Sequence, residues 1–205
     1  MTGHSTTSGA ARLELMNRLE LARHASELLH GKEQALQRER VRLAGHADRA
    51  RRQWVESCER AAVWLQRARC LGASDELAVL VRQGGPPATV TIEWQTSMGI
   101  TYPGSVRCDP GPLPPVTSTA ALLPAAEAYR RALEAAAEHA ATSAAVRRLD
   151  DELAATRRRR RAIEEHLQPT LDAARRALDL HLDELDREEA LRVRVAAGRR
   201  EDDRP

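Results

Sequence analysis

The chain has 205 residues, of which 30% are charged, 42% hydrophobic and only 2% aromatic, with no Phe. A compact core of this size normally relies on aromatic side chains, so the composition excludes a β-sandwich, a β-barrel or a doubly wound sheet and is typical of long helices. Thirty-two Lys and Arg against thirty Asp and Glu give a formal net charge of +2, which indicates neither a nucleic-acid nor a membrane partner.

The chain opens with small polar residues. The stretch MTGHSTTSGA lacks the basic and apolar regions of a secretory signal, so we predict a disordered arm over 1–10. No stretch approaches the roughly 18 apolar residues of a membrane span. The three cysteines lack metal-ligand spacing, which favours reduced thiols in the cytosol.

A heptad repeat predicts a long N-terminal coiled-coil helix over 11–72. Its first stripe comprises Leu15, Ala22, Leu29, Leu36, Leu43, Ala50, Ser57, Trp64 and Leu71. A second, weaker stripe comprises Leu19, Ser26, Glu33, Arg40, Ala47, Trp54, Ala61 and Ala68. Such a stripe requires a partner helix to cover it.

Prolines and glycines gather in 73–117, which predicts a non-helical insert. Within it, residues 89–94 alternate with period two and place Val90, Ile92 and Trp94 on one face of a strand. A second short extended piece after Gly99 is expected to complete a β-hairpin. Residues 74–82 fit either a helix or a strand.

Helical composition returns over 118–198, which predicts a C-terminal coiled-coil helix, with a frayed tail over 199–205. Its stripe comprises Val146, Leu149, Leu153, Thr156, Ile163, Leu167, Leu171, Ala174, Leu178 and Leu185. The steps alternate between three and four, except that two steps of four follow each other around Pro169. A proline inside a helix bends it, so a kink is expected there.

We therefore predict a mainly all-α fold, in which the two long helices form an antiparallel two-helix coiled coil with a small central β-hairpin. Two separate helices that dimerise with other chains fit the sequence less well. The chain has no phosphate-binding loop, and its only lysine is Lys32. The histidines lack metal-ligand spacing, and no nucleophile motif is present, so we expect no catalytic, cofactor-binding or metal site.

Five consecutive arginines, Arg157, Arg158, Arg159, Arg160 and Arg161, are the sharpest charge feature. Consecutive helical residues point in directions about 100° apart, so one of them, Arg160, is expected to face the partner helix. The simplest interpretation is a solvated face balanced by nearby acids. Those acids would repel phosphate, and no stacking aromatic lies nearby, so a protein socket is more plausible than a nucleic acid.

Three segments resemble the D subunit of the V-type/A-type ATPases. The first-helix pattern A-x-x-G-x-x-L-L-K-x-K-R-D-x-L appears with Ala22, Leu28, Leu29, Lys32 and Leu36. Ala25 replaces its glycine, and Glu33-Gln34 replaces its Arg-Asp pair. The family's M-G-V-x-x-P element appears as MGITYP, and its T-R-R-R block followed by a proline appears from Thr156 to Pro169. The family's closing L-x-E-x-E-R-E resembles LDELDREE. The resemblance spans nearly the whole chain.

The resemblance implies a non-catalytic central rotor shaft, cytoplasmic and peripheral to the membrane, that couples ATP turnover to ion transport. It implies as partners the A and B subunits of the catalytic hexamer, a small F subunit and a funnel-shaped d/C subunit, with no nucleic acid and no membrane insertion. As hexamer contacts we place Lys32, Arg157, Arg158, Arg159, Arg160 and Arg161. As a side-subunit contact or modulatory hairpin we place Val90, Ile92, Trp94, Met98, Gly99, Ile100 and Pro103.

Two other classes of function remain open from the residues alone. A cytosolic coiled-coil adaptor, such as a flagellar-type export chaperone, would explain the periodicity but not the MGITYP element. A nucleic-acid-binding coiled coil would use the arginine run, and its binding would fall steeply with salt.

Overall fold

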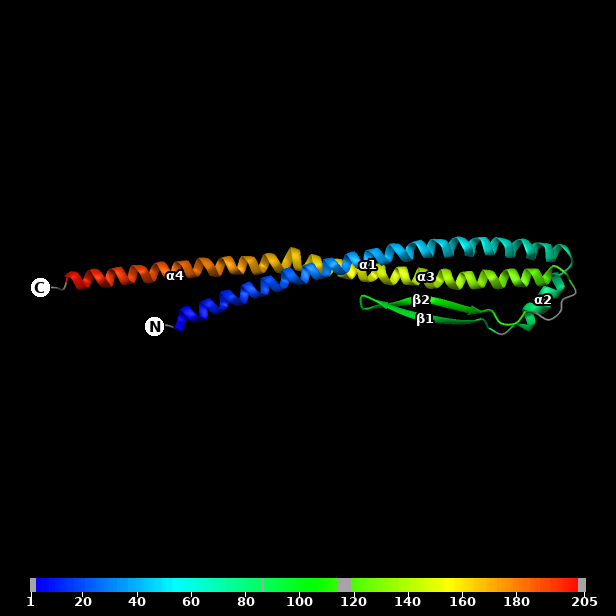
Figure 1. The fold of residues 1–205 in the computed structure, drawn as a ribbon, viewed down its shortest axis with the longest axis horizontal. Coiled ribbons are helices and arrows are strands. Elements are labelled where there is room, and N and C mark those ends of the chain that lie inside the picture. Colours follow the sequence, from blue (N-terminus) through cyan, green and yellow to red (C-terminus); the bar gives the residue numbers. More distant parts are fainter. Residues whose placement is uncertain (1–2, 86, 114–118, 203–205) are drawn as a thin grey trace. The chain divides into compact units, whose positions relative to one another are not determined.

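A computed structural model describes residues 3–85, 87–113 and 119–202, and the side chains of 9–85, 87–113 and 119–196. The elements in chain order are α1 (Gly3–Cys70), α2 (Ser74–Gln83), β1 (Thr89–Ser97), β2 (Ile100–Asp109), α3 (Leu122–Ala162), the π-helical turn η1 (Ile163–Leu167) and α4 (Gln168–Asp202) (Figure 1). The mainly helical fold with a small hairpin is therefore confirmed. The chain divides into a central unit, 34–154, and a terminal unit, 1–33 with 155–205.

Three boundaries differ from those expected. α1 begins at Gly3, so residues 3–10 are helical where a disordered arm was predicted, because extending an existing helix costs far less than nucleating one. Residues 74–83 form helix α2 inside the insert that was expected to be non-helical, although the sequence left 74–82 open between helix and strand. α4 continues to Asp202, past the predicted end near 198. Residues 1–2, Pro86, 114–118 and 203–205 lie outside the described part of the chain.

In the central unit, α1 and α3 pack antiparallel. Arg40 of α1 pairs with Asp150 of α3 at 2.9 Å, and Trp54, further along α1, stacks on His139, earlier in α3, with ring centroids 5.3 Å apart. The core holds apolar residues from the first α1 stripe, from the C-terminal stripe and from the hairpin. Its buried members are Leu36, Leu43, Tyr102, Ala145, Leu149 and Leu153. The expected antiparallel pairing is confirmed within this unit.

The hairpin attaches to the helices through β2, the strand nearer to them (Figure 1), whereas every residue of β1 except Ser97 is exposed. Met98 and Gly99 form the turn with φ of 51° and 79°, the left-handed pair that a tight two-residue hairpin turn requires. Tyr102 is 3% exposed and donates a hydrogen bond to Glu39 at 2.9 Å. Burial raises the pKa of its phenol, and Arg42 holds the pKa of the Glu39 carboxyl below its ordinary value.

A second hydrophobic cluster lies where the end of α1, helix α2 and the start of α3 meet. Ala68 and Ala73 pack on Ala121 and Leu122 at the start of α3, and α2 contributes Leu77 and Leu80. The small alanines let the turn after α1 approach α3 closely.

In the terminal unit, the start of α1 packs antiparallel on the end of α3 and on α4. Arg12 contacts Asp179 at 2.9 Å, whereas Gln168, earlier in the C-terminal helices, bonds Ala22, later in α1. Few of the described apolar side chains are buried here. Among the described residues of this unit, the buried ones are Leu19, Ala22, Ser26 and Thr156.

The C-terminal stripe is correct up to Ile163, but beyond it only Leu171 and Leu178 are even half-buried. Leu167 and Leu185 are 45% and 42% exposed, and Ala174 is exposed. The physical reason is η1, which ends just before Gln168 and Pro169, where a kink was expected. A π turn contains one residue more than an α turn, so the residues beyond it face a different direction.

Tyr102→Ala should detach the hairpin from the helices, because it removes the hairpin's side chain from the buried core cluster. We expect a loss of about 3–5 kcal/mol in the free energy of unfolding, measured by urea denaturation, and faster proteolysis within β1 and β2. Trp94→Ala, on the exposed strand of the same hairpin, should change stability by less than about 0.5 kcal/mol. Equal losses for the two variants would contradict this anchoring role.

Candidate functional site

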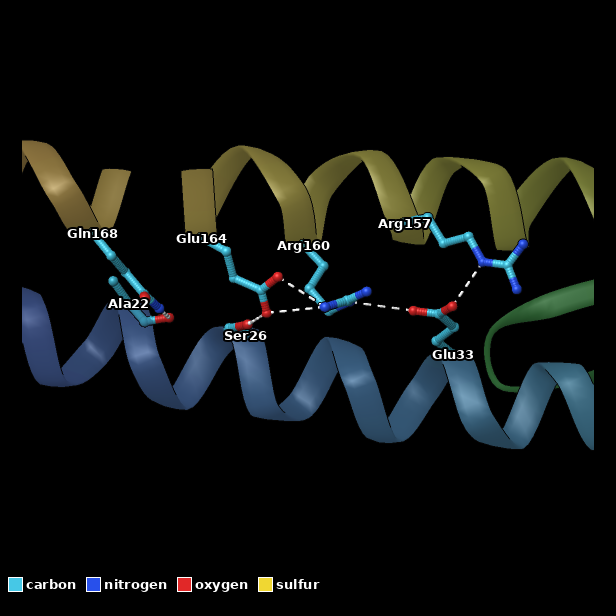
Figure 2. Close-up of polar contacts among 7 residues, drawn as sticks. All are labelled: Ala22, Ser26, Glu33, Arg157, Arg160, Glu164 and Gln168. Carbon is cyan, nitrogen blue, oxygen red and sulfur yellow. Dashed lines mark hydrogen bonds and ion pairs between the residues drawn. The ribbon is translucent and has the colours of Figure 1, made fainter. Parts of the chain in front are cut away.

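The arginine run lies at the C-terminal end of α3, in the terminal unit, and its members have unequal surroundings. Arg160 is 25% exposed and Arg157 46% exposed, and both point toward α1 (Figure 2). Arg158, Arg159 and Arg161 are exposed. The expectation that Arg160 faces the partner helix is therefore confirmed.

One carboxylate of α1 holds both inward-facing arginines. Glu33 accepts a hydrogen bond from Nε of Arg157 at 2.7 Å through Oε1 and another from Nε of Arg160 at 3.2 Å through Oε2. The Glu33 side chain is only 16% exposed. A carboxylate that uses both oxygens on two guanidinium groups fixes the position of α1 along α3 as well as neutralising charge.

The polar contacts continue from Arg160 toward α4 (Figure 2). Nη1 of Arg160 donates to Oε2 of Glu164 at 2.8 Å, and Oγ of Ser26, on α1, donates to Oε1 of Glu164 at 2.5 Å. One turn further, Nε2 of Gln168 donates to the backbone oxygen of Ala22 at 3.4 Å. We call the residues Ser26, Glu33, Arg157, Arg160, Glu164 and Gln168 the polar ladder.

The charges of the polar ladder stabilise one another. The hydrogen bond from Arg157 is the largest influence that lowers the pKa of Glu33, and the charges of both arginines add to it. The pKa of Glu164 is also lowered, mainly by the hydrogen bond from Ser26 and then by that from Arg160. The pKa of Arg160 is raised in turn by its bond to Glu164. Both of these carboxyl groups are therefore ionised at neutral pH.

The sequence located some of this ladder and missed the rest. Of the predicted hexamer contacts, Arg157 and Arg160 belong to the ladder, whereas Lys32 is half-buried on α1 beside Glu33. Glu33 and Ser26 were placed on the weaker α1 stripe, but Glu33 was not recognised as the partner of the arginines, nor Ser26 as the partner of Glu164. The available signal was their position, since polar residues in a stripe that faces another helix need polar partners.

The predicted hairpin site divides into an exposed part and an anchored part. Val90, Ile92, Trp94 and Met98 are 50%, 39%, 57% and 55% exposed. In contrast, Ile100 packs against the helix core and Pro103 is buried. Val90, Ile92 and Trp94 give β1 an exposed apolar face, Met98 and Gly99 lie in the turn, and the anchored members hold the hairpin on the helices.

A groove of about 810 Å³ lies beside β2 in the central unit. It runs between α1 and α3, and its lining includes the charged side chains of Arg60, Arg107, Arg131 and Glu134 and the aromatic side chain of Trp64.

Comparison with known families decides what this helix pair is. The family model for the D subunit of ATP synthase matches residues 11–198. The chain belongs to the ATP synthase D-subunit family. A search of curated proteins found no match.

Membership in the D-subunit family confirms the resemblance to the D subunit of the V-type/A-type ATPases and makes the chain a stalk component of a rotary ATPase complex. The matched range includes both long helices, the hairpin and the whole polar ladder. Within the described part of this D-subunit chain, no helix combines the length and hydrophobicity that a bilayer span requires.

Glu33→Gln should destabilise this D-subunit chain at neutral pH and much less in acid. Because the pKa of Glu33 is lowered in the folded chain, its ionised carboxylate stabilises the fold fully when the pH is above the ordinary pKa of 4.5. This stabilisation disappears as the pH falls through the lower pKa of the folded state. We expect a loss of about 1 kcal/mol at pH 7, the scale of a partly exposed ion pair, which shrinks as the pH falls below 4.5. Urea denaturation at a series of pH values measures it.

The control is Glu188→Gln, which breaks an exposed pair with Arg192 at 3.3 Å within α4. It should cost less than about 0.5 kcal/mol at any pH. An equal cost for both variants would mean that the polar ladder adds nothing beyond surface charge.

Proposed function

We propose that this chain is the central rotor shaft of a V-type/A-type ATPase and that it transmits torque between the hexamer of A and B subunits and the membrane ion-translocating ring. The observation that carries the proposal is the family match across both long helices and the insert between them. The antiparallel helix packing inside each unit supports it, because a shaft must be built from elements that brace each other.

Torque transmission requires resistance to twisting. A single helix twists easily, whereas two helices joined along a stripe must break their contacts to do so. The central unit has buried leucines along this stripe, and the terminal unit has the polar ladder. Both kinds of contact oppose rotation of one helix against the other.

Coupling also requires an asymmetric surface. A rotor favours the open or closed state of a catalytic site only if its faces make different contacts in the two states. The terminal unit offers such faces, because Arg157 and Arg160 are engaged with Glu33 while Arg158 and Arg161 are exposed. We place the hexamer contact on Arg158 and Arg161, opposite acidic groups of the ring.

Reconstitution with the A and B subunits tests this function. We expect the chain to assemble with the hexamer and the double variant Arg158→Gln, Arg161→Gln to assemble but to lower coupled ion transport per ATP hydrolysed by about tenfold, since exposed charges act on the partner rather than on the shaft. Its circular dichroism and unfolding midpoint should match those of the unchanged chain.

The matched control is Arg157→Gln, Arg160→Gln, which removes the same charge from the inward side. This variant should lower the stability of the isolated chain, since Glu33 then loses both cations. Failure of the chain to assemble with the hexamer would reject the shaft function, whereas normal coupling in the outward variant would reject only the contact.

The hairpin is the second proposed contact, with the small F subunit as its partner. The apolar face of β1 and the groove beside β2 support it, because exposed apolar area of this kind is suited to a protein interface. Trp94→Ala should weaken F-subunit binding by at least tenfold, measured by calorimetry. Thr91→Ala, an exposed change elsewhere on β1, is the control and should leave the affinity unchanged.

A cytosolic adaptor or flagellar-type export chaperone is the alternative. It would share the helix pair but would not bind A and B subunits. The assembly experiment therefore separates the two functions.

A further inference from the structure

The π-helical turn η1 interrupts the C-terminal helices inside the terminal unit. The backbone N–H of Gln168 donates to the oxygen of Ile163, a spacing of five residues instead of the four of an α-helix. Such a turn carries one additional residue and is often found at functional sites. One additional residue rotates the downstream helix by about 100° relative to a regular α-helix.

Because of this rotation, a polar stripe of α4 faces α1. Gln168, Asp172, Arg175 and Asp179 are half-buried. Gln168 bonds the backbone of Ala22, and Asp179 contacts Arg12 at 2.9 Å.

The same segment carries a second stripe that is apolar and comprises Leu167, Ala174 and Leu185. If the helix continued without the extra residue, steps of about 100° would place this stripe in line with the buried Thr156. In the structure its three side chains are exposed. Leu171 and Leu178, on the border between the two stripes, are half-buried. The sequence therefore contains a coherent inward face for each of two helix rotations.

We propose that η1 is a register switch of the terminal unit. With the π turn present, the polar stripe faces α1. With the π turn converted to a regular α turn, α4 rotates by about 100° and the leucine stripe faces α1 instead. The outer surface of the unit then changes from one that displays leucines to one that displays charged side chains.

Pro169 is the residue that holds the switch in the observed state. A regular α-helix through Pro169 would set its ring against the carbonyl of Glu165 and leave that oxygen without its usual donor. A wider turn directly before the proline relieves this contact. Burial of the leucine stripe favours the opposite state, so two opposing effects meet at one residue.

Thiol labelling of the full chain tests the switch. Cys58→Ser, Cys70→Ser and Cys108→Ser first remove the native thiols, and single cysteines are then introduced by the pairs Leu167→Cys and Gln168→Cys, and Ala174→Cys and Arg175→Cys. In this background, labelling by a maleimide should be about tenfold faster for the first member of each pair than for the second, because positions 167 and 174 are exposed.

Pro169→Ala is the decisive change. Added to each single-cysteine variant, it should invert the order, so that labelling becomes slower at positions 167 and 174 than at 168 and 175. An unchanged order would overturn the proposal, as would equal labelling of both members of a pair before the proline is replaced.

Deletion of Glu165 is the matched second variant. It removes the additional residue itself, so the helix can run regularly past η1 while the polar stripe still faces α1. The original labelling order should persist, and an inverted order would overturn the proposal. Circular dichroism of each variant is the control for folding. An unchanged helix content means that the labelling order reports rotation and not unfolding.

Discussion

Each long helix of this chain must bury a stripe of side chains that is only a few residues wide, and the rest of the structure depends on how that stripe is matched. A pair of helices leaves most of its surface in water, so little area is available to stabilise it. In the central unit, Leu36 and Leu43 meet Leu149 and Leu153, and the hairpin adds Tyr102 as a third contributor. The hairpin therefore enlarges a core that two helices alone would leave thin.

In the terminal unit, polar side chains rather than leucines make the main contacts between α1 and the C-terminal helices. Glu33, shared between Arg157 and Arg160, joins the helices of this unit, whereas leucines join those of the central unit. An ion pair at a partly exposed position contributes little net stability, but it accepts only one alignment of its partners, whereas apolar side chains tolerate several. We interpret the polar ladder as the feature that sets the alignment of α1 with the C-terminal helices in this unit.

This division has a consequence for a stalk component of a rotary ATPase. Charges used inside the helix pair are unavailable to a partner, so the five arginines cannot all have the same role. Only the exposed members can meet another protein without disturbing the contacts between the helices. The exposed apolar face of β1 follows the same logic, because Tyr102 on β2 holds the hairpin while Trp94 on β1 stays accessible. In the arginine run and in the hairpin alike, some residues hold the helices or strands together while others stay exposed to solvent.

The sequence by itself determined the long helices, the hairpin, the two α1 stripes and the family, because heptad spacing, strand alternation and proline placement are local properties of the chain. The inward orientation of Arg160 was equally predictable, since five successive helical residues cover every direction. Tertiary structure decided the partners: that Glu33 joins the arginines and that Tyr102 bonds Glu39 depends on which turns of distant segments lie opposite each other. It also decided that Leu167 and Ala174 are exposed. A single π turn changes the direction of every residue beyond it, and a stripe counted along the sequence assumes that each turn of the helix has the same width.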